Sequence, residues 1–178
     1  NGLKLFVHIS DIPYFGEHTQ MTMLCDDCGW KNTDFIPAEG KKPGAWNFTI
    51  SKNKHMTVRV VRSSSCTIRI ADIGLEVEPG GNSSGYITNI EGVLNRFKGI
   101  VEMILRQAVR DNDDSINKCE KLISKIKEIK NGKREVDILL LDPMGHSQIL
   151  HKDAVSRDLA SDEIKDLAVG PTVPVFDV

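Results

Sequence analysis

The chain has 178 residues, of which 40% are hydrophobic and 27% are charged, and its formal net charge is −2. A chain of this length buries most of the surface that its unfolded form exposes, so it needs neither a metal nor disulfides merely to fold. The near-neutral charge disfavours a nucleic-acid binder, which normally carries an excess of Lys and Arg. No apolar run approaches the ~20 residues of a membrane helix, and four cysteines are too few for a secreted disulfide scaffold. The composition therefore predicts a soluble, cytoplasmic protein without a membrane partner.

The first half of the chain has the pattern of half-buried strands. Apolar and polar residues alternate over residues 3–10, and the same period of two recurs in later segments. Strands that alternate in this way bury one face and expose the other, as in antiparallel sheets. We therefore expect a mostly antiparallel sheet in this half. The later segments are 21–25, 46–50, 56–60, 66–70 and 75–77.

Two amphipathic helices are predicted next. Thr88 and Glu91 have the spacing of a capping box, with Thr88 as the N-cap. Apolar residues then recur at three- and four-residue steps for about five turns, and a second, shorter stripe follows a polar break. Together these patterns predict a helical hairpin at about residues 89–131.

Strands return after the predicted hairpin, at residues 136–141 and 148–151. Asp142-Pro143-Met144-Gly145 separates them and has the composition of a turn, so we expect the two strands to form a β-hairpin. The order of strands, helical hairpin and strands predicts an α+β fold, with helices packed on one side or end of the sheet.

Cys25-Asp26-Asp27-Cys28-Gly29 is the motif with the clearest chemistry. Two cysteines separated by two residues can turn both sulfurs toward one point, and Gly29 permits the tight turn that this requires. Such a turn supplies half of a tetrahedral Cys₄ zinc site. The alternatives are a redox dithiol and two unliganded thiols. We favour structural zinc, because redox motifs usually open a helix in a βαβ unit and no helical pattern follows here.

The remaining candidate residues are cysteines and aromatic residues. Cys66 lies on an alternating strand and Cys119 on a helical stripe, so both are predicted to be small buried hydrophobes. Tyr14, Phe15 and Trp30 flank the cysteine pair, where they either pack the small zinc module or bind a partner. The sequence has no nucleophile elbow, phosphate loop or paired-carboxylate motif, which predicts a protein that is not an enzyme and has no small-molecule substrate.

Several spaced segments, in the right order, resemble motifs of the ZPR-type zinc-finger proteins, specifically the single-module form found in archaea. The most specific match is the segment of residues 85–94, GYITNIEGVL. Residues 142–147, DPMGHS, follow the family's D-P-x-G-N-S with His146 in place of Asn. The other matching segments are 12–17 (IPYFGE), 25–30 (CDDCGW), 60–70 (VVRSSSCTIRI) and 74–79 (GLEVEP).

The resemblance implies a fold and a metal. It implies that residues 1–38 are the second half of a zinc-ribbon module. Residues 39–178 would form a mostly antiparallel β-sandwich of double-stranded β-helix type, with the helical hairpin inserted into it. The family's first C-x-x-C-G would fall ahead of Asn1, so the resemblance implies that Cys25 and Cys28 bind zinc together with two cysteines from that earlier motif.

The resemblance also implies a function. Eukaryotic relatives in this family, which have two such modules in tandem, bind elongation factor 1-alpha, the GTPase that delivers aminoacyl-tRNA, and assist its folding. We therefore expect a non-catalytic, zinc-binding interaction protein that acts as a folding or assembly factor for such a GTPase. The alternative is a nucleic-acid-binding zinc ribbon in translation or transcription, which the net charge disfavours. An enzyme would need His and carboxylate ligands that converge inside the sandwich.

Overall fold

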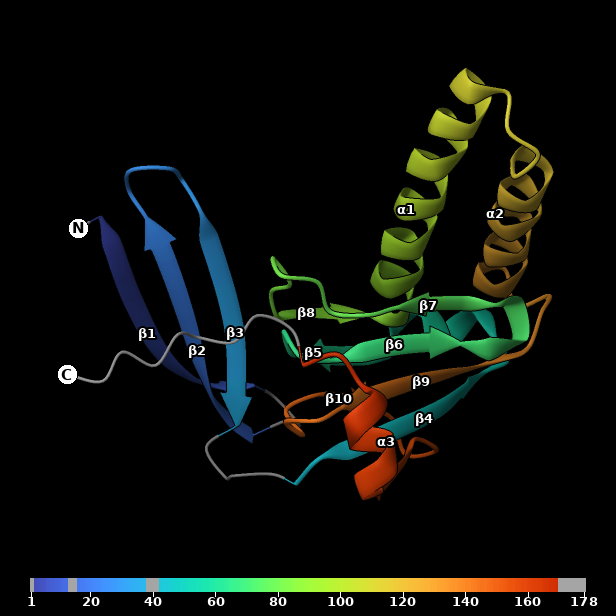
Figure 1. The fold of residues 1–178 in the computed structure, drawn as a ribbon. Helices are drawn as coiled ribbons and strands as arrows, with labels where there is room; N and C mark the ends of the chain where they lie inside the picture. Colours follow the sequence, from blue (N-terminus) through green and yellow to red (C-terminus); the bar gives the residue numbers. More distant parts are fainter. Residues whose placement is uncertain (1, 13–15, 38–41, 170–178) are drawn as a thin grey trace.

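The computed structural model describes residues 2–12, 16–37 and 42–169 of the chain. Within these ranges three antiparallel sheets and three α-helices are present, so the predicted α+β class is confirmed (Figure 1). None of the helices in these ranges combines the length and apolarity that crossing a membrane requires. The boundary predicted between residues 38 and 39 falls at residues outside the described ranges and stays a prediction.

The N-terminal sheet has three strands in the order β1 (Leu3–Ile12), β2 (Gly16–Cys25) and β3 (Lys31–Pro37). It stands beside the rest of the molecule, with β3 as the nearest strand and β1 as the outer edge (Figure 1). The Asn32 side chain donates a 2.8 Å hydrogen bond to the Ser83 carbonyl. Ser64 donates to the Asp34 carboxyl through its N–H at 3.0 Å and its hydroxyl at 2.6 Å. The contacts of β3 therefore attach this sheet to the remainder of the chain.

Two further sheets form a sandwich around the main hydrophobic core. The first has the order β11-β4-β9-β6-β7 and the second the order β10-β5-β8. Phe48 and Ile138 from the first sheet and Val60 and Ile149 from the second belong to one buried cluster, so the sheets face each other across that core. The strands are β4 (Gly44–Ile50), β5 (Arg59–Arg62), β6 (Thr67–Ile70), β7 (Leu75–Val77), β8 (Tyr86–Asn89), β9 (Val136–Asp142), β10 (Gln148–Leu150) and β11 (Val155–Asp158).

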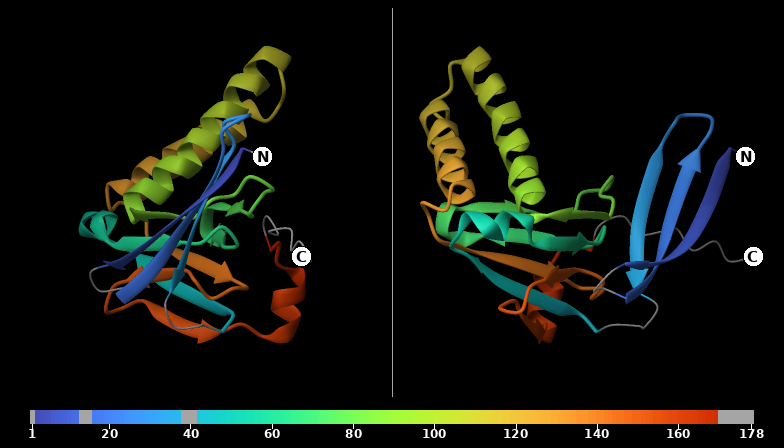
Figure 2. Two further views of the ribbon diagram at one scale, coloured as in Figure 1. Left: turned by 90° about the vertical axis from the view of Figure 1, so that its left-hand side faces the viewer. Right: turned by 180° about the vertical axis from the view of Figure 1, so that it is seen from behind.

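The predicted helical hairpin is present, as α1 (Ile90–Asp111) and α2 (Ile116–Lys130). It projects away from the sandwich, and its base shares the main core through residues such as Leu94 and Ile129 (Figure 2). A third, short helix, α3 (Ser161–Asp166), follows β11.

The residue expected to cap the N-terminus of α1 was wrong. Asn89, not Thr88, caps α1: strand β8 pairs through Asn89, and the Asn89 side chain accepts a hydrogen bond from the Gly92 N–H.

The turn of residues 142–147 does not close a β-hairpin, contrary to expectation. Strand β9 pairs with β4 and β6, whereas β10 pairs with β5, so the turn carries the chain from one sheet to the other. The Asp142 carboxyl, 1% exposed, accepts hydrogen bonds from the hydroxyls of Ser63, Ser65 and Ser147 at 2.8, 2.6 and 2.7 Å. This buried group therefore joins the crossover turn to the loop between β5 and β6.

We expect Asp142→Asn to lower the free energy of unfolding by about 2 kcal/mol, because a carboxamide offers only one acceptor oxygen to three buried hydroxyls. Urea denaturation followed by circular dichroism measures this change. Asp137→Asn is the matched control, since Asp137 lies on the same strand and is exposed. Its effect should stay below about 1 kcal/mol. Equal losses in the two variants would contradict the role of Asp142.

Candidate functional site

The two candidate zinc ligands lie in the tight turn between β2 and β3. Cys25 ends β2, and Cys28 follows at the exposed end of the turn. The Gly29 N–H donates to the Cys25 carbonyl at 2.9 Å, and the Cys25 N–H donates to the Trp30 carbonyl at 2.8 Å. Gly29 has a φ of +73°, a conformation that favours glycine over other residues. The turn is therefore closed by its backbone and brings the two thiols close together.

The turn stabilises the thiolate that a metal would require. The backbone N–H of Cys28, the Cys28 thiol and the backbone N–H of Asp27 hydrogen-bond to the Cys25 sulfur and lower the pKa of that thiol. Burial of Cys25 and the charge of Asp26 act in the opposite direction. Lys4 partly compensates that charge, since its ammonium lies 2.6 Å from the Asp26 carboxyl. Thiolates, rather than thiols, are both the metal ligands and the nucleophiles of cysteine chemistry.

The described residues bring two cysteines of the turn together, and no third metal-binding side chain joins them. No group of three or more His, Cys, Asp or Glu side chains in the described ranges is placed to hold a metal ion. The first described residue, Gly2, lies against the turn, because its carbonyl accepts a 2.8 Å hydrogen bond from the Asp26 N–H. Strand β1 starts directly opposite, where Leu3 pairs with Cys25. The donor set and its backbone hydrogen bonds thus fit one of the two cysteine pairs of a zinc ribbon.

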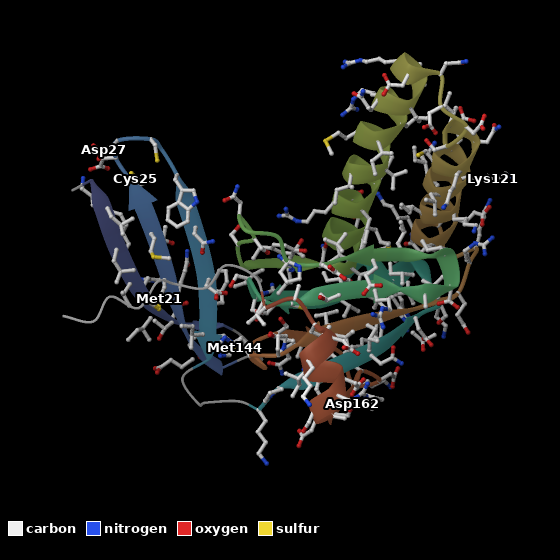
Figure 3. All side chains as sticks on the ribbon, in the orientation of Figure 1. Met21, Cys25, Asp27, Lys121, Met144 and Asp162 are labelled. Atoms are coloured by element: carbon white, nitrogen blue, oxygen red, sulfur yellow. The ribbon has the colours of Figure 1, made fainter. Side chains whose placement is uncertain are left out.

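Figure 3 places Cys25 and Asp27 together at one end of the N-terminal sheet, beside the start of β1. Trp30, which was expected to bind a partner or to pack the module, follows the turn directly and is half-buried. Tyr14 and Phe15 lie outside the described residues. A role for these aromatic residues in partner binding stays a prediction.

The other two cysteines are buried, as expected. Cys119 is 5% exposed and lies on α2. Cys66 is fully buried, and its burial, followed by the nearby Asp142 charge, raises the pKa of its thiol to about 12. A thiol with that pKa stays protonated and inert under physiological conditions. The reactive sulfur chemistry of the described chain is therefore confined to the turn at Cys25 and Cys28.

Two polar clusters were not predicted from the sequence. One is the set of hydrogen bonds around Asp142, and the other is Tyr86, whose ring contacts the guanidinium groups of Arg62 and Arg96 at 5.5 and 4.0 Å from its centroid. A run of three serines between two alternating strand patterns was the available signal for the first cluster. The second had no signal, because its residues come from β5, β8 and α1.

Comparisons with known proteins agree on one family. A family model described as the ZPR1 jelly-roll domain matches residues 54–165. An uncharacterized ZPR1-like protein of Pyrococcus horikoshii is 35% identical over 97% of this chain and 78% of its own length. A second one, of Methanocaldococcus jannaschii, is 37% identical over 92% of this chain and 81% of its length. The zinc finger chaperone zpr1 of Schizosaccharomyces pombe is 23% identical over 83% of this chain, which spans 33% of that protein.

We expect iodoacetamide to modify Cys25 and Cys28 in the folded chain and to leave Cys66 and Cys119 unmodified until the chain is denatured. Because hydrogen bonds lower the pKa of Cys25, its alkylation rate should rise at a lower pH in the folded chain than in urea. Peptide mass spectrometry over a pH series measures both effects. Modification of Cys66 as fast as Cys28 in native buffer would contradict the buried environment of the Cys66 thiol.

Proposed function

Because this chain belongs to the ZPR1 family of zinc-finger proteins, we propose that it is a zinc-binding interaction protein for an elongation factor 1-alpha-like GTPase, whose folding or assembly it assists. The observation that carries this proposal is the turn at Cys25 and Cys28, with N–H groups directed at the Cys25 sulfur. The names of its relatives describe zinc finger proteins, and one of them a chaperone. None of these names describes an enzyme.

The proposed zinc is structural. Cys25 and Cys28 supply two of its four thiolates, and we propose that a second cysteine pair supplies the other two. One observation places the start of β1 close to this ligand pair, since the Gly2 carbonyl accepts a hydrogen bond from the Asp26 N–H. When bound, the metal supplies a cross-link and no redox or Lewis-acid step, because four thiolates leave no open coordination position.

The N-terminal sheet has a small hydrophobic core, so a metal cross-link would add to its stability. Among its described side chains only Phe35 is a buried hydrophobe, and Phe35 packs against Val61 of the sandwich rather than within the sheet. A sheet with so small a core is marginal in water by itself. In zinc ribbons metal binding contributes folding free energy directly, so the metal would hold this sheet in shape.

The outer strand of this sheet supports a protein partner. Leu3, Leu5, Val7 and Ile9 lie on one face of β1, and each is more than half exposed. The hydrogen-bonding edge of β1 that faces away from β2 has no neighbouring strand among the described residues. An exposed apolar face next to an open edge is suited to an extended, incompletely folded segment, which can add as a further strand. A folding factor for a GTPase client requires such a surface.

We expect the full-length protein to bind one zinc ion and both Cys25→Ser and Cys28→Ser to lose it, because each removes one of four thiolates. Metal content after dialysis, measured by inductively coupled plasma mass spectrometry, tests this. Cys119→Ala is the matched control, since Cys119 lies in α2, away from the turn. Unchanged zinc in both Ser variants would overturn the metal assignment.

We expect the full-length protein to raise the yield of refolded elongation factor 1-alpha-like GTPase when the denatured GTPase is diluted from urea. Binding of a fluorescent GDP analogue measures the yield, and serum albumin at equal concentration is the control. Cys25→Ser should lose the effect, because the N-terminal sheet is then no longer held by zinc. An unchanged yield, with no complex in the nucleotide-free, GDP or GTP state, would refute the proposed client.

A further inference from the structure

One long face of α1 is exposed, because α2 packs against a different side of that helix. Arg96, Ile100, Met103, Gln107 and Arg110 recur at steps of four and three residues, so they share one side of the helix; we call them the α1 stripe. Ile100 is 40% and Met103 58% exposed, although both are large hydrophobics. In Figure 1 and in the reverse view of Figure 2, α1 stands on the side of the hairpin nearer to the N-terminal sheet.

A cavity of about 440 Å³ lies at the base of the α1 stripe, between α1 and the strands β6, β7 and β8. Its apolar lining includes Ile68, Val77 and Phe97, and Ile100 and Met103 extend that lining onto the stripe. A volume of this size is typical of pockets that bind side chains or small ligands. The apolar surface does not stop at the cavity, because Met103 also borders a second hollow that reaches Arg110.

The charges on this face lack acidic partners. The Arg96 guanidinium lies 4.0 Å from the centroid of the Tyr86 ring, but Arg96 has no hydrogen bond or ion pair with any described residue. Arg62, whose guanidinium lies 5.5 Å from the same ring centroid, is different, since it donates to the Cys66 carbonyl at 2.7 Å and to the Ser83 hydroxyl at 2.9 Å. Arg96 therefore keeps its donors available at the entrance of an apolar cavity.

The far end of the α1 stripe also has an arginine without an ion-pair partner among the described residues. Within the described chain Arg110 likewise has no carboxylate partner. The exposed carboxyl groups that border the same hollow as Arg110 accept hydrogen bonds from other groups: Asp111 from the Gln107 side chain at 2.7 Å, and Asp113 from the Ser115 N–H at 2.6 Å. The stripe thus presents two unpaired guanidinium groups, one at each end of an apolar surface.

We propose that the α1 stripe and the cavity at its base bind an acidic amphipathic segment of a partner protein. An apolar side chain of that segment fills the cavity, and carboxylates lie beside Arg96 and Arg110. The stretch of α1 from Arg96 to Arg110 spans roughly 21 Å, which matches about four turns of a partner helix and exceeds a small carboxylic acid. This is the helix-in-groove mode of recognition, with charges at both ends fixing the register. The inference needs neither zinc nor the GTPase client.

The test uses the 178-residue chain and a fluorescein-labelled synthetic peptide of about 15 residues, long enough to cover the stripe as a helix. The peptide carries Leu at helical spacing, Glu on both sides of that apolar face, and Ala elsewhere. Fluorescence anisotropy should show saturable binding. Arg96→Glu should weaken it by about tenfold, which corresponds to the loss of one close charge pair. Met103→Ser should also weaken binding. This variant should fold normally, because Met103 is exposed and lies outside the buried core.

Lys121→Glu is the matched control, because it makes the same change of charge on the other helix (Figure 3). It should leave the affinity unchanged. A second peptide with Lys in place of each Glu should bind the Arg96→Glu, Arg110→Glu double variant more tightly than it binds the unmodified chain.

Three results would overturn the proposal: no saturable binding of the acidic peptide, equal weakening by Arg96→Glu and Lys121→Glu, or equal binding of both peptides to the unmodified chain. Cys25→Ser should bind the acidic peptide normally, so a failure of the zinc proposal would be distinguishable from a failure at this surface.

Discussion

Three consecutive serines in the loop between β5 and β6 connect the parts of the molecule. Ser63 and Ser65 donate to Asp142 at the crossover between the two sheets of the sandwich. Ser64, which stands between them in sequence, donates to Asp34 on β3. Hydrogen bonds to a charged carboxylate contribute more than those between neutral groups, and they contribute most when water is excluded. One short loop therefore fixes both the sandwich crossover and the position of the N-terminal sheet.

Within the N-terminal sheet, the residues that hold the sheet to the sandwich differ from the residues that could bind a metal or a partner. Strand β3 provides the attachment through Asn32 and Asp34, whereas the cysteine turn precedes β3 and the open edge belongs to β1. A metal at the turn can thus stabilise the sheet without altering the hydrogen bonds that hold it to the sandwich. The hairpin is held independently, since its base contributes Leu94, Ile126 and Ile129 to the main core. The molecule therefore has two separate candidate binding surfaces. One is on β1 of the N-terminal sheet, and the other is the α1 stripe of the hairpin.

Local periodicity predicted the elements well, because strands and helices impose periods that one sequence can display. It predicted strands at residues 3–10 and 46–50 and the helical hairpin, while the C-x-x-C-G motif predicted the turn at Cys25 and Cys28. The strand expected over 56–60 was wrong in part, because Met56 and Thr57 belong to a 3₁₀ helix, Asn53–Thr57, and strands β3 and β11 were not predicted. Local periodicity failed where the answer depends on which elements become neighbours. The composition of Asp142-Pro143-Met144-Gly145 indicates a turn, but not whether the next strand joins the same sheet. The N-cap of α1 moved to Asn89 because pairing with Arg59 extends β8 by one residue beyond Thr88. The position of Arg96 over Tyr86 depends on packing between a helix and a strand, and no local pattern encodes it.

The edge of β1 that has no neighbouring strand among the described residues favours self-association of the chain. Natural sheets usually guard an edge with proline, bulges or inward-pointing charges. Strand β1 runs for ten residues, and residues 3–10 include no proline and a single lysine. Such an edge is a template for cross-β stacking of identical chains. A chain that pairs with β1 therefore covers the exposed apolar face and the unpaired edge together, and removes this template.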